Sequence, residues 1–166
     1  MDKVSEILPR LYQGSFPPPG SYLSKKGIRV LALCAIELQP PATNFTGVQV
    51  LRCPLHDTYD PLTADERVML QRIATHLAAA VRGGKKVLVS CAQGINRSGL
   101  LTALTLRELT GMSGLDAVRL IRRKRPGALS NESFVALLEA LPGKTVEAGD
   151  FQERRKKGSA AFLGER

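Results

Sequence analysis

The chain has 166 residues and 43% of them are hydrophobic, which predicts one globular domain and excludes a disordered chain. Its three cysteines (Cys34, Cys53 and Cys91) and two histidines (His56 and His76) lack the number and spacing of a disulfide scaffold or a zinc site, so we expect no metal and no other cofactor. The net charge of +9 favours an anionic partner such as phosphorylated protein, phosphoinositide or nucleic acid, although a solvated basic surface explains it equally well.

The amino-terminal half of the chain is predicted to consist mainly of strands. Short apolar or alternating runs predict strands at residues 8–14, 28–33 and 48–52. Residues 21–26 are predicted to form one or two helical turns that end at Gly27. A polar loop over residues 55–61 follows the third strand.

The second half alternates helices with one strand. Thr63 and Glu66 have the spacing of a capping box and predict the start of a helix that ends at Gly83-Gly84. A strand at 86–90, a helix at 97–109, a helix from Ser113 to about Arg125, and a last helix capped by Asn131 or Ser130 are expected next. This alternation predicts an α/β fold in which helices flank a central, mostly parallel sheet.

The predicted domain spans residues 1–146. Residues 147–166 are charged and poor in apolar side chains, so we expect a mobile C-terminal tail. No apolar stretch is long enough to span a membrane, and residues 1–6 lack the apolar segment of a signal peptide. We therefore expect a cytoplasmic location.

One segment carries most of the functional information. Residues 87–99 read Val-Leu-Val-Ser-Cys-Ala-Gln-Gly-Ile-Asn-Arg-Ser-Gly, so Cys91 ends a strand and Arg97 begins a helix. A short loop between them can point its backbone N–H groups inward, and the helix N-terminus adds positive potential. Arg97 can direct two N–H groups at two phosphate oxygens. The segment predicts a phosphate site made of Ala92, Gln93, Gly94, Ile95, Asn96 and Arg97.

The same groups make Cys91 a candidate nucleophile. Nearby positive potential is expected to lower the pKa of its thiol and allow attack on phosphorus, which gives a cysteinyl-phosphate. Ser98 could donate a hydrogen bond to the sulfur when water hydrolyses that intermediate. The general acid is expected on a polar loop at the carboxyl end of a strand. Asp57 is the first candidate and Asp60 the second, since Asp65 is placed to stabilise a helix N-terminus.

Cys91 to Ser98 resembles the Cys-x5-Arg-Ser/Thr signature of the cysteine-based protein tyrosine phosphatase superfamily. The surrounding sequence, roughly residues 4–141, is similar to the compact dual-specificity branch, including residues 8–15, 27–33, 54–57 and 125–134. The resemblance implies metal-free hydrolysis of phosphotyrosine, and of phosphoserine or phosphothreonine, in a phosphorylated protein. It also implies that Cys91 is the nucleophile, Arg97 holds phosphate, Asp57 is the acid and Ser98 assists the second step.

Two features of the loop leave alternatives open. The family usually has histidine before the cysteine, whereas this chain has Ser90, which can hydrogen bond but carries no charge. The resemblance then implies a higher thiolate pKa and slower turnover, or a phospho-binding pseudophosphatase. The Gly-x-Asn-Arg sequence ending at Arg97 and the basic residues of 119–125 resemble RNA 5′-phosphatases of the superfamily. The favoured explanations are that Asn96 supports hydrogen bonds within the loop, and that the basic residues form partly a solvated face and partly structural pairs.

Cys34 follows a strand that is expected to lie beside the strand ending at Cys91. Parallel neighbours would bring both thiols to one sheet edge, so a reversible Cys34–Cys91 disulfide that protects the nucleophile is a hypothesis. Cys34 as an apolar core residue is the favoured alternative.

Overall fold

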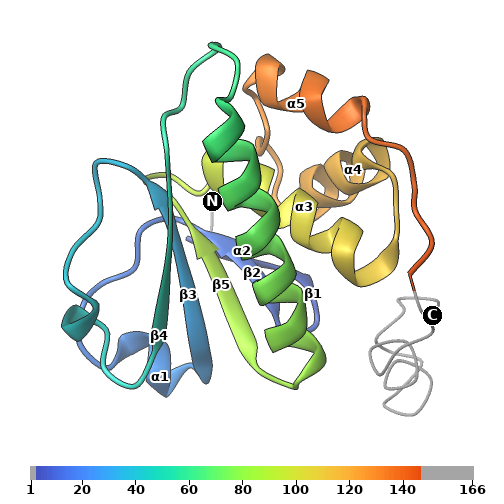
Figure 1. Cartoon of the computed structure of the whole chain (residues 1–166). Helices are drawn as coiled ribbons and strands as arrows, with labels where there is room; N and C mark the ends of the chain where they lie inside the picture. Colours follow the sequence, from blue (N-terminus) through green and yellow to red (C-terminus); the bar gives the residue numbers. More distant parts are fainter. Residues whose placement is uncertain (1–2, 147–166) are drawn as a thin grey trace.

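A five-stranded sheet forms the centre of the computed structural model, which describes residues 3–146 (Figure 1). In spatial order the strands are β1 (Val4–Leu8), β2 (Leu11–Gly14), β5 (Lys86–Ser90), β3 (Ile28–Ala35) and β4 (Gln49–Leu55). Only the β1–β2 pair is antiparallel. The predicted α/β fold with a mostly parallel sheet is therefore confirmed.

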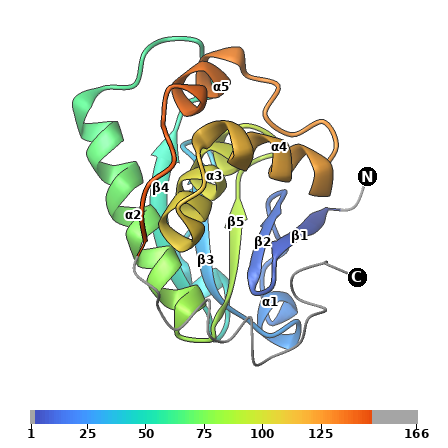
Figure 2. The same ribbon diagram turned by 90° about the vertical axis from the view of Figure 1, so that its right-hand side faces the viewer.

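Helices cover the two faces of the sheet unequally. The larger layer consists of α2 (Ala64–Arg82), α3 (Arg97–Thr110), α4 (Gly114–Lys124) and α5 (Glu132–Glu139). The strands lie between this layer and α1 (Tyr22–Lys25), as the turned view shows (Figure 2). Successive β3 side chains alternate between the two faces, so Ala32 and Cys34 join the main core while Leu31 and Leu33 join the smaller one.

The helix ends follow the predicted local signals. Thr63 Oγ1 accepts from Glu66 N–H at 3.1 Å and Glu66 Oε1 accepts from Thr63 N–H at 2.9 Å, which is the predicted capping box. Asn131 rather than Ser130 caps α5, because Asn131 Oδ1 accepts from the N–H groups of Ser133 and Phe134.

The predicted single strand at residues 8–14 is wrong in its boundaries. The segment contains a turn at Arg10, whose φ is +73°, and the chain forms a hairpin from β1 and β2. The sequence pattern did not indicate β1 because this edge strand buries only Ile7 and leaves Glu6 exposed.

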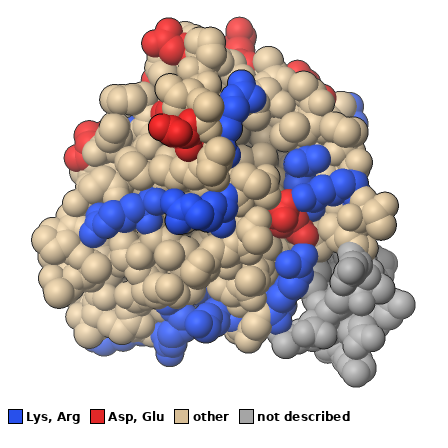
Figure 3. All heavy atoms as spheres, viewed as in Figure 1, with Lys and Arg blue, Asp and Glu red and all other residues tan. Residues whose placement is uncertain are grey.

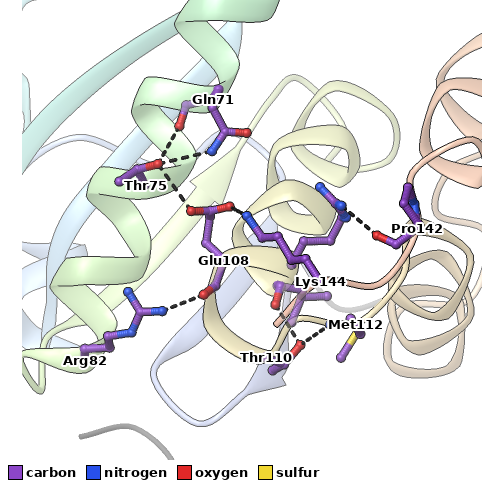
Figure 4. Close-up of polar contacts among 10 residues, drawn as sticks. Gln71, Thr75, Arg82, Glu108, Thr110, Met112, Pro142 and Lys144 are labelled. Carbon is purple, nitrogen blue, oxygen red and sulfur yellow. Dashed lines mark hydrogen bonds and ion pairs between the residues drawn. The ribbon is translucent and has the colours of Figure 1, made fainter. Parts of the chain in front are cut away.

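Polar contacts around Glu108 connect α2, α3 and the segment after α5 (Figure 4). The Glu108 carboxylate contacts Thr75 of α2 and pairs with Lys144, which lies beyond α5. The Glu108 carbonyl accepts a hydrogen bond from Arg82 at the end of α2. These contacts hold α2, α3 and the segment after α5 in one arrangement.

The predicted tail at residues 147–166 lies outside the described residues. Within residues 3–146, no helix is both long enough and apolar enough to cross a membrane.

Parallel register determines where the functional loops meet. β3, β4 and β5 run in the same direction, so their carboxyl ends lie at one edge of the sheet. Glu37 follows β3, Asp57 follows β4 and Cys91 follows β5. Helix α3 begins at the same edge with Arg97.

Candidate active site

Cys91 and Ser98 lie side by side at this edge of the sheet. Both residues are buried, and the Cys91 thiol donates to Ser98 Oγ at an Sγ–Oγ distance of 3.2 Å. The first turn of α3 presents Ser98 to the sulfur because the chain reverses through the loop after β5 and returns as a helix. Ser98 is thus in position to donate to the sulfur once the sulfur is a thiolate.

The loop between Cys91 and Arg97 has its carbonyl groups engaged from outside. The Ala92 carbonyl accepts from Phe16 N–H at 3.4 Å, and the Gln93 carbonyl accepts from Arg125 Nη2 at 3.2 Å. The Gly94 carbonyl accepts from Arg125 Nε at 2.7 Å and from Gln13 Nε2 at 3.0 Å. The Ile95 carbonyl accepts from Leu129 N–H at 3.0 Å. None of the N–H groups of residues 92–96 donates to another group within the described residues 3–146. The loop therefore keeps its donors available and its acceptors occupied, which is the arrangement that an anion site needs.

Arg97 is held by two groups that sequence analysis did not assign to the site. Its Nη1 and Nη2 donate to the two carboxylate oxygens of Glu37 at 2.6 and 2.8 Å, and Nη1 also donates to the Leu55 carbonyl at 3.0 Å. Arg97 Nε is buried and has no hydrogen-bond partner among the described residues. The edge formed by Nε–H and the second Nη2 hydrogen has the planar geometry that can donate to two oxygens at once.

Glu37 remains an anion over the whole physiological range. Its hydrogen bonds to Arg97 are the main cause that lowers the pKa of the Glu37 carboxyl to about 2. The pair in turn raises the pKa of Arg97. Because the folded-state pKa of Glu37 is depressed, the contribution of the pair to stability is present above pH 4.5 and is lost as the pH falls toward 2. The position of Glu37 just beyond the strand next to β5 is the sequence signal that could have indicated this residue.

Asp57 is connected directly to the loop. Its Oδ2 accepts from Asn96 Nδ2 at 3.1 Å and its Oδ1 accepts from Asn131 Nδ2 at 2.8 Å. Asp60 is exposed, and its N–H donates to Thr58 Oγ1 in a local turn. An open hollow of about 530 Å³ is lined by Glu37, His56, Asp57, Thr58, Asp60 and Arg97. Both candidate acids therefore border the space beside Arg97, but only Asp57 contacts the loop.

Comparisons with known proteins identify the family of the chain. The family described as "Dual specificity phosphatase, catalytic domain" matches residues 11–141. The chain belongs to this family. Human dual specificity phosphatase 28 is 31% identical over 151 residues, covering 87% of this chain and 82% of that protein. The structure of the present chain is also similar to the crystal structure of a mouse putative dual specificity phosphatase complexed with zinc tungstate. The two share 25% identity and a TM-score of 0.71, and the match covers 94% of this chain and 91% of the other. The active form of Tk-PTP gives 26% identity and a TM-score of 0.68, covering 82% of this chain and 96% of the other.

Ser90 does not form the hydrogen bond that its residue type would allow. It is fully buried at the end of β5, and its Oγ has no partner among residues 3–146 of this phosphatase. The capacity of Ser90 to hydrogen bond, which the sequence left open, is therefore not used among these residues. The small side chain leaves the support of the loop to the donors from Gln13 and Arg125.

We expect Ser90→Ala to be silent or slightly stabilising. A buried hydroxyl without a partner carries only a desolvation penalty, so its removal is expected to leave the free energy of unfolding unchanged or to raise it by up to about 1 kcal/mol, with kcat/KM unaltered. Urea unfolding and hydrolysis of p-nitrophenyl phosphate provide the measurements. Ser98→Ala is the matched comparison, because it removes a hydroxyl that contacts Cys91 and should slow turnover. A clear loss of stability in Ser90→Ala would show that the hydroxyl is bonded.

Cys34 lies in the core of this phosphatase next to Cys53. Burial is the main cause that raises the pKa of the Cys34 thiol well above its usual value, and a hydrogen bond with Cys53 and the charge of Cys91 act in the same direction. Cys34, Cys53 and Cys91 are all free thiols. A raised pKa makes Cys34 a weak attacking group. The reversible Cys34–Cys91 disulfide stays a prediction.

The charged side chains on one face of the molecule are dispersed (Figure 3). Lys and Arg side chains form separate groups on the face seen in Figure 1, and Asp and Glu side chains gather near the end at which α2 begins (Figure 3). This face therefore has no continuous basic surface of the kind that tracks a nucleic-acid backbone. Within the described residues, no three His, Cys, Asp or Glu side chains are grouped so that they could hold a metal ion.

Proposed function

We propose that this phosphatase hydrolyses phosphomonoesters through a cysteinyl-phosphate formed on Cys91. The observation that carries the proposal is the state of the loop after Cys91. Its carbonyl oxygens are bound by groups from other segments, its N–H groups have no acceptor among residues 3–146, and Arg97 offers a two-donor edge. These donors would bind the equatorial oxygens of the phosphoryl group and stabilise them as charge shifts during the reaction.

The proposed reaction has two displacements. The Cys91 thiolate attacks phosphorus, so the S–P bond forms while the bond from phosphorus to the ester oxygen breaks. The Asp57 carboxyl gives its proton to the departing oxygen. Water then attacks phosphorus and gives a proton to the Asp57 carboxylate, while the P–S bond breaks and the thiolate is restored. Ser98 donates a hydrogen bond to the departing sulfur, which its 3.2 Å distance supports.

We propose phosphorylated protein as the substrate, with phosphotyrosine and also phosphoserine or phosphothreonine as the groups hydrolysed. Membership of the dual-specificity family supports this substrate class.

The alternative of an RNA 5′-phosphatase rested on Asn96 and on basic residues. Asn96 is occupied by hydrogen bonds to Asp57, Ser130 and Asn131, which accounts for it without RNA. A cytoplasmic location remains a prediction from the sequence.

A trapping experiment tests the proposal. The protein is mixed with p-nitrophenyl phosphate in the presence of a chelator and quenched rapidly, and peptides are analysed by mass spectrometry. Cys91 is expected to carry one phosphoryl group on its sulfur, and Cys91→Ser cannot form this P–S bond because it has no sulfur at that position. Parallel assays compare a phosphotyrosine peptide, a phosphoserine peptide and triphosphate-ended RNA. Binding of phosphopeptide without turnover would support the pseudophosphatase alternative instead, and release of phosphate from RNA alone would support the RNA phosphatase.

A further inference from the structure

Two asparagine side chains hold the proposed general acid by both of its oxygens. Asn131 Nδ2 donates to Asp57 Oδ1 at 2.8 Å and to the Thr58 carbonyl at 3.0 Å, while Asn96 Nδ2 donates to Asp57 Oδ2 at 3.1 Å. The loop that carries Asp57 is otherwise exposed, and Tyr59 two residues later has 73% of its surface accessible. The position of Asp57 thus depends on side chains that come from other parts of the chain.

The orientation of both amides is fixed by their oxygen atoms. Asn131 Oδ1 accepts the N–H groups of Ser133 and Phe134 and so caps α5. Asn96 Oδ1 accepts the Asn131 N–H at 2.8 Å and Ser130 Oγ at 3.3 Å. Because each oxygen faces donors, each NH₂ group must face Asp57, and a flipped amide would place two donors or two acceptors together.

We propose that Asn131 and Asn96 are positioning residues for the reaction, and that they hold the Asp57 carboxyl over the phosphate loop where it can reach the leaving oxygen. This inference rests on the proposed role of Asp57. Asn96 directly precedes Arg97, so the same segment that holds phosphate also sets the position of the acid. Asn131 adds a link to the start of α5, which its side-chain oxygen caps. A displacement of about 1 Å at a reacting group can slow a reaction by about 100-fold, so such links matter to the rate.

Dependence on the leaving group distinguishes a positioning role from a structural one. A general acid matters for phenyl phosphate, whose phenolate leaves poorly, and matters little for an aryl phosphate with several electron-withdrawing substituents. Asn131→Ser is the informative variant, because serine caps a helix as well as asparagine but is too short to reach Asp57. We expect this variant to lower kcat/KM for phenyl phosphate about 10- to 100-fold and to change kcat/KM for the activated ester by less than about 3-fold.

A double-mutant cycle completes the test. Asn131→Ser is expected to cause no further loss for phenyl phosphate when it is added to Asp57→Asn. Ser113→Ala, which removes the cap of α4 away from the site, controls for a general loss of helix stability and should affect neither ester. If Asn131→Ser lowers both esters equally, or adds its loss to that of Asp57→Asn, the positioning role is overturned while the role of Asp57 stands. If Asp57→Asn lowers kcat/KM for the two esters by the same factor, the assignment of Asp57 as the acid is wrong and this inference fails with it.

Discussion

Replacing Arg97 by lysine is expected to lower kcat/KM for p-nitrophenyl phosphate by about 1,000-fold. The Arg97 guanidinium binds Glu37 end-on through both terminal nitrogens, and its Nε has no partner among the described residues. In the proposed mechanism the Nε–H edge binds the phosphoryl oxygens. The lysine ammonium keeps the charge but lacks the planar set of donors of a guanidinium. It can therefore pair with Glu37 or contact the phosphate, but it cannot pair with Glu37 and donate to two phosphate oxygens at the same time. Loss of one preorganised donor toward developing charge slows enzymes by about 100- to 1,000-fold, and here two donors are displaced.

Steady-state kinetics and inhibition by inorganic phosphate measure the effect of Arg97→Lys. Binding of inorganic phosphate should weaken together with kcat/KM, because the same edge binds both ligands. Arg123→Lys is the matched control, since Arg123 is an exposed residue of α4 and the same substitution there should leave both quantities unchanged. A loss of 10-fold or less in Arg97→Lys would contradict the two-edge arrangement.

Gly94→Ala is expected to lower the free energy of unfolding by about 2–4 kcal/mol, which combines a left-handed backbone cost with the cost of overpacking. Gly94 has a φ of +70°, and a Cβ atom there would lie 2.3 Å from the Gly14 carbonyl carbon and 2.5 Å from the Gly14 oxygen. These neighbours are backbone atoms at the end of β2 and cannot rotate aside. The loop must shift instead, so we expect kcat/KM to fall by about 100-fold as the N–H groups lose their positions.

Gly20→Ala separates the two causes. Gly20 has a φ of +88°, but a Cβ atom there would have no neighbour within 4 Å. This control is expected to show only the left-handed backbone cost of about 1–2 kcal/mol and unchanged kinetics. Urea unfolding followed by circular dichroism gives both stabilities. Equal losses of stability in the two variants would show that close packing against β2 does not restrict the loop between Cys91 and Arg97.

Local signals predicted most of the fold and the centre of the site. The capping box at Thr63, the apolar run before Cys91 and the spacing from Cys91 to Arg97 are short-range patterns, and each corresponds to an element with nearly the expected bounds. The hairpin of β1 was missed because an edge strand shows weak alternation, and its turn uses a non-glycine residue, Arg10, at positive φ.

The parts of the site that the sequence did not reveal are contacts between distant segments. Glu37 reaches Arg97 across 60 positions, and Arg125 reaches the Gly94 carbonyl across 31. A carboxylate after a strand or an arginine near a helix end has many ordinary uses, so neither pattern indicates its partner. Asp57 could be predicted because the carboxyl edge of a parallel sheet collects functional loops, whereas the two amides that hold it depend on side-chain packing.

The contacts of Lys144 bear on where this domain can be cut. The family match ends at residue 141, but Arg107 Nη2 donates to the Pro142 carbonyl at 2.7 Å and Lys144 N–H donates to the Gly111 carbonyl at 2.8 Å. The Lys144 ammonium also pairs with Glu108. A chain shortened to the family boundary would leave a nearly buried arginine and the carbonyl end of α3 facing water. The folding unit thus extends at least through Lys144, and a tag or a domain junction belongs beyond that residue.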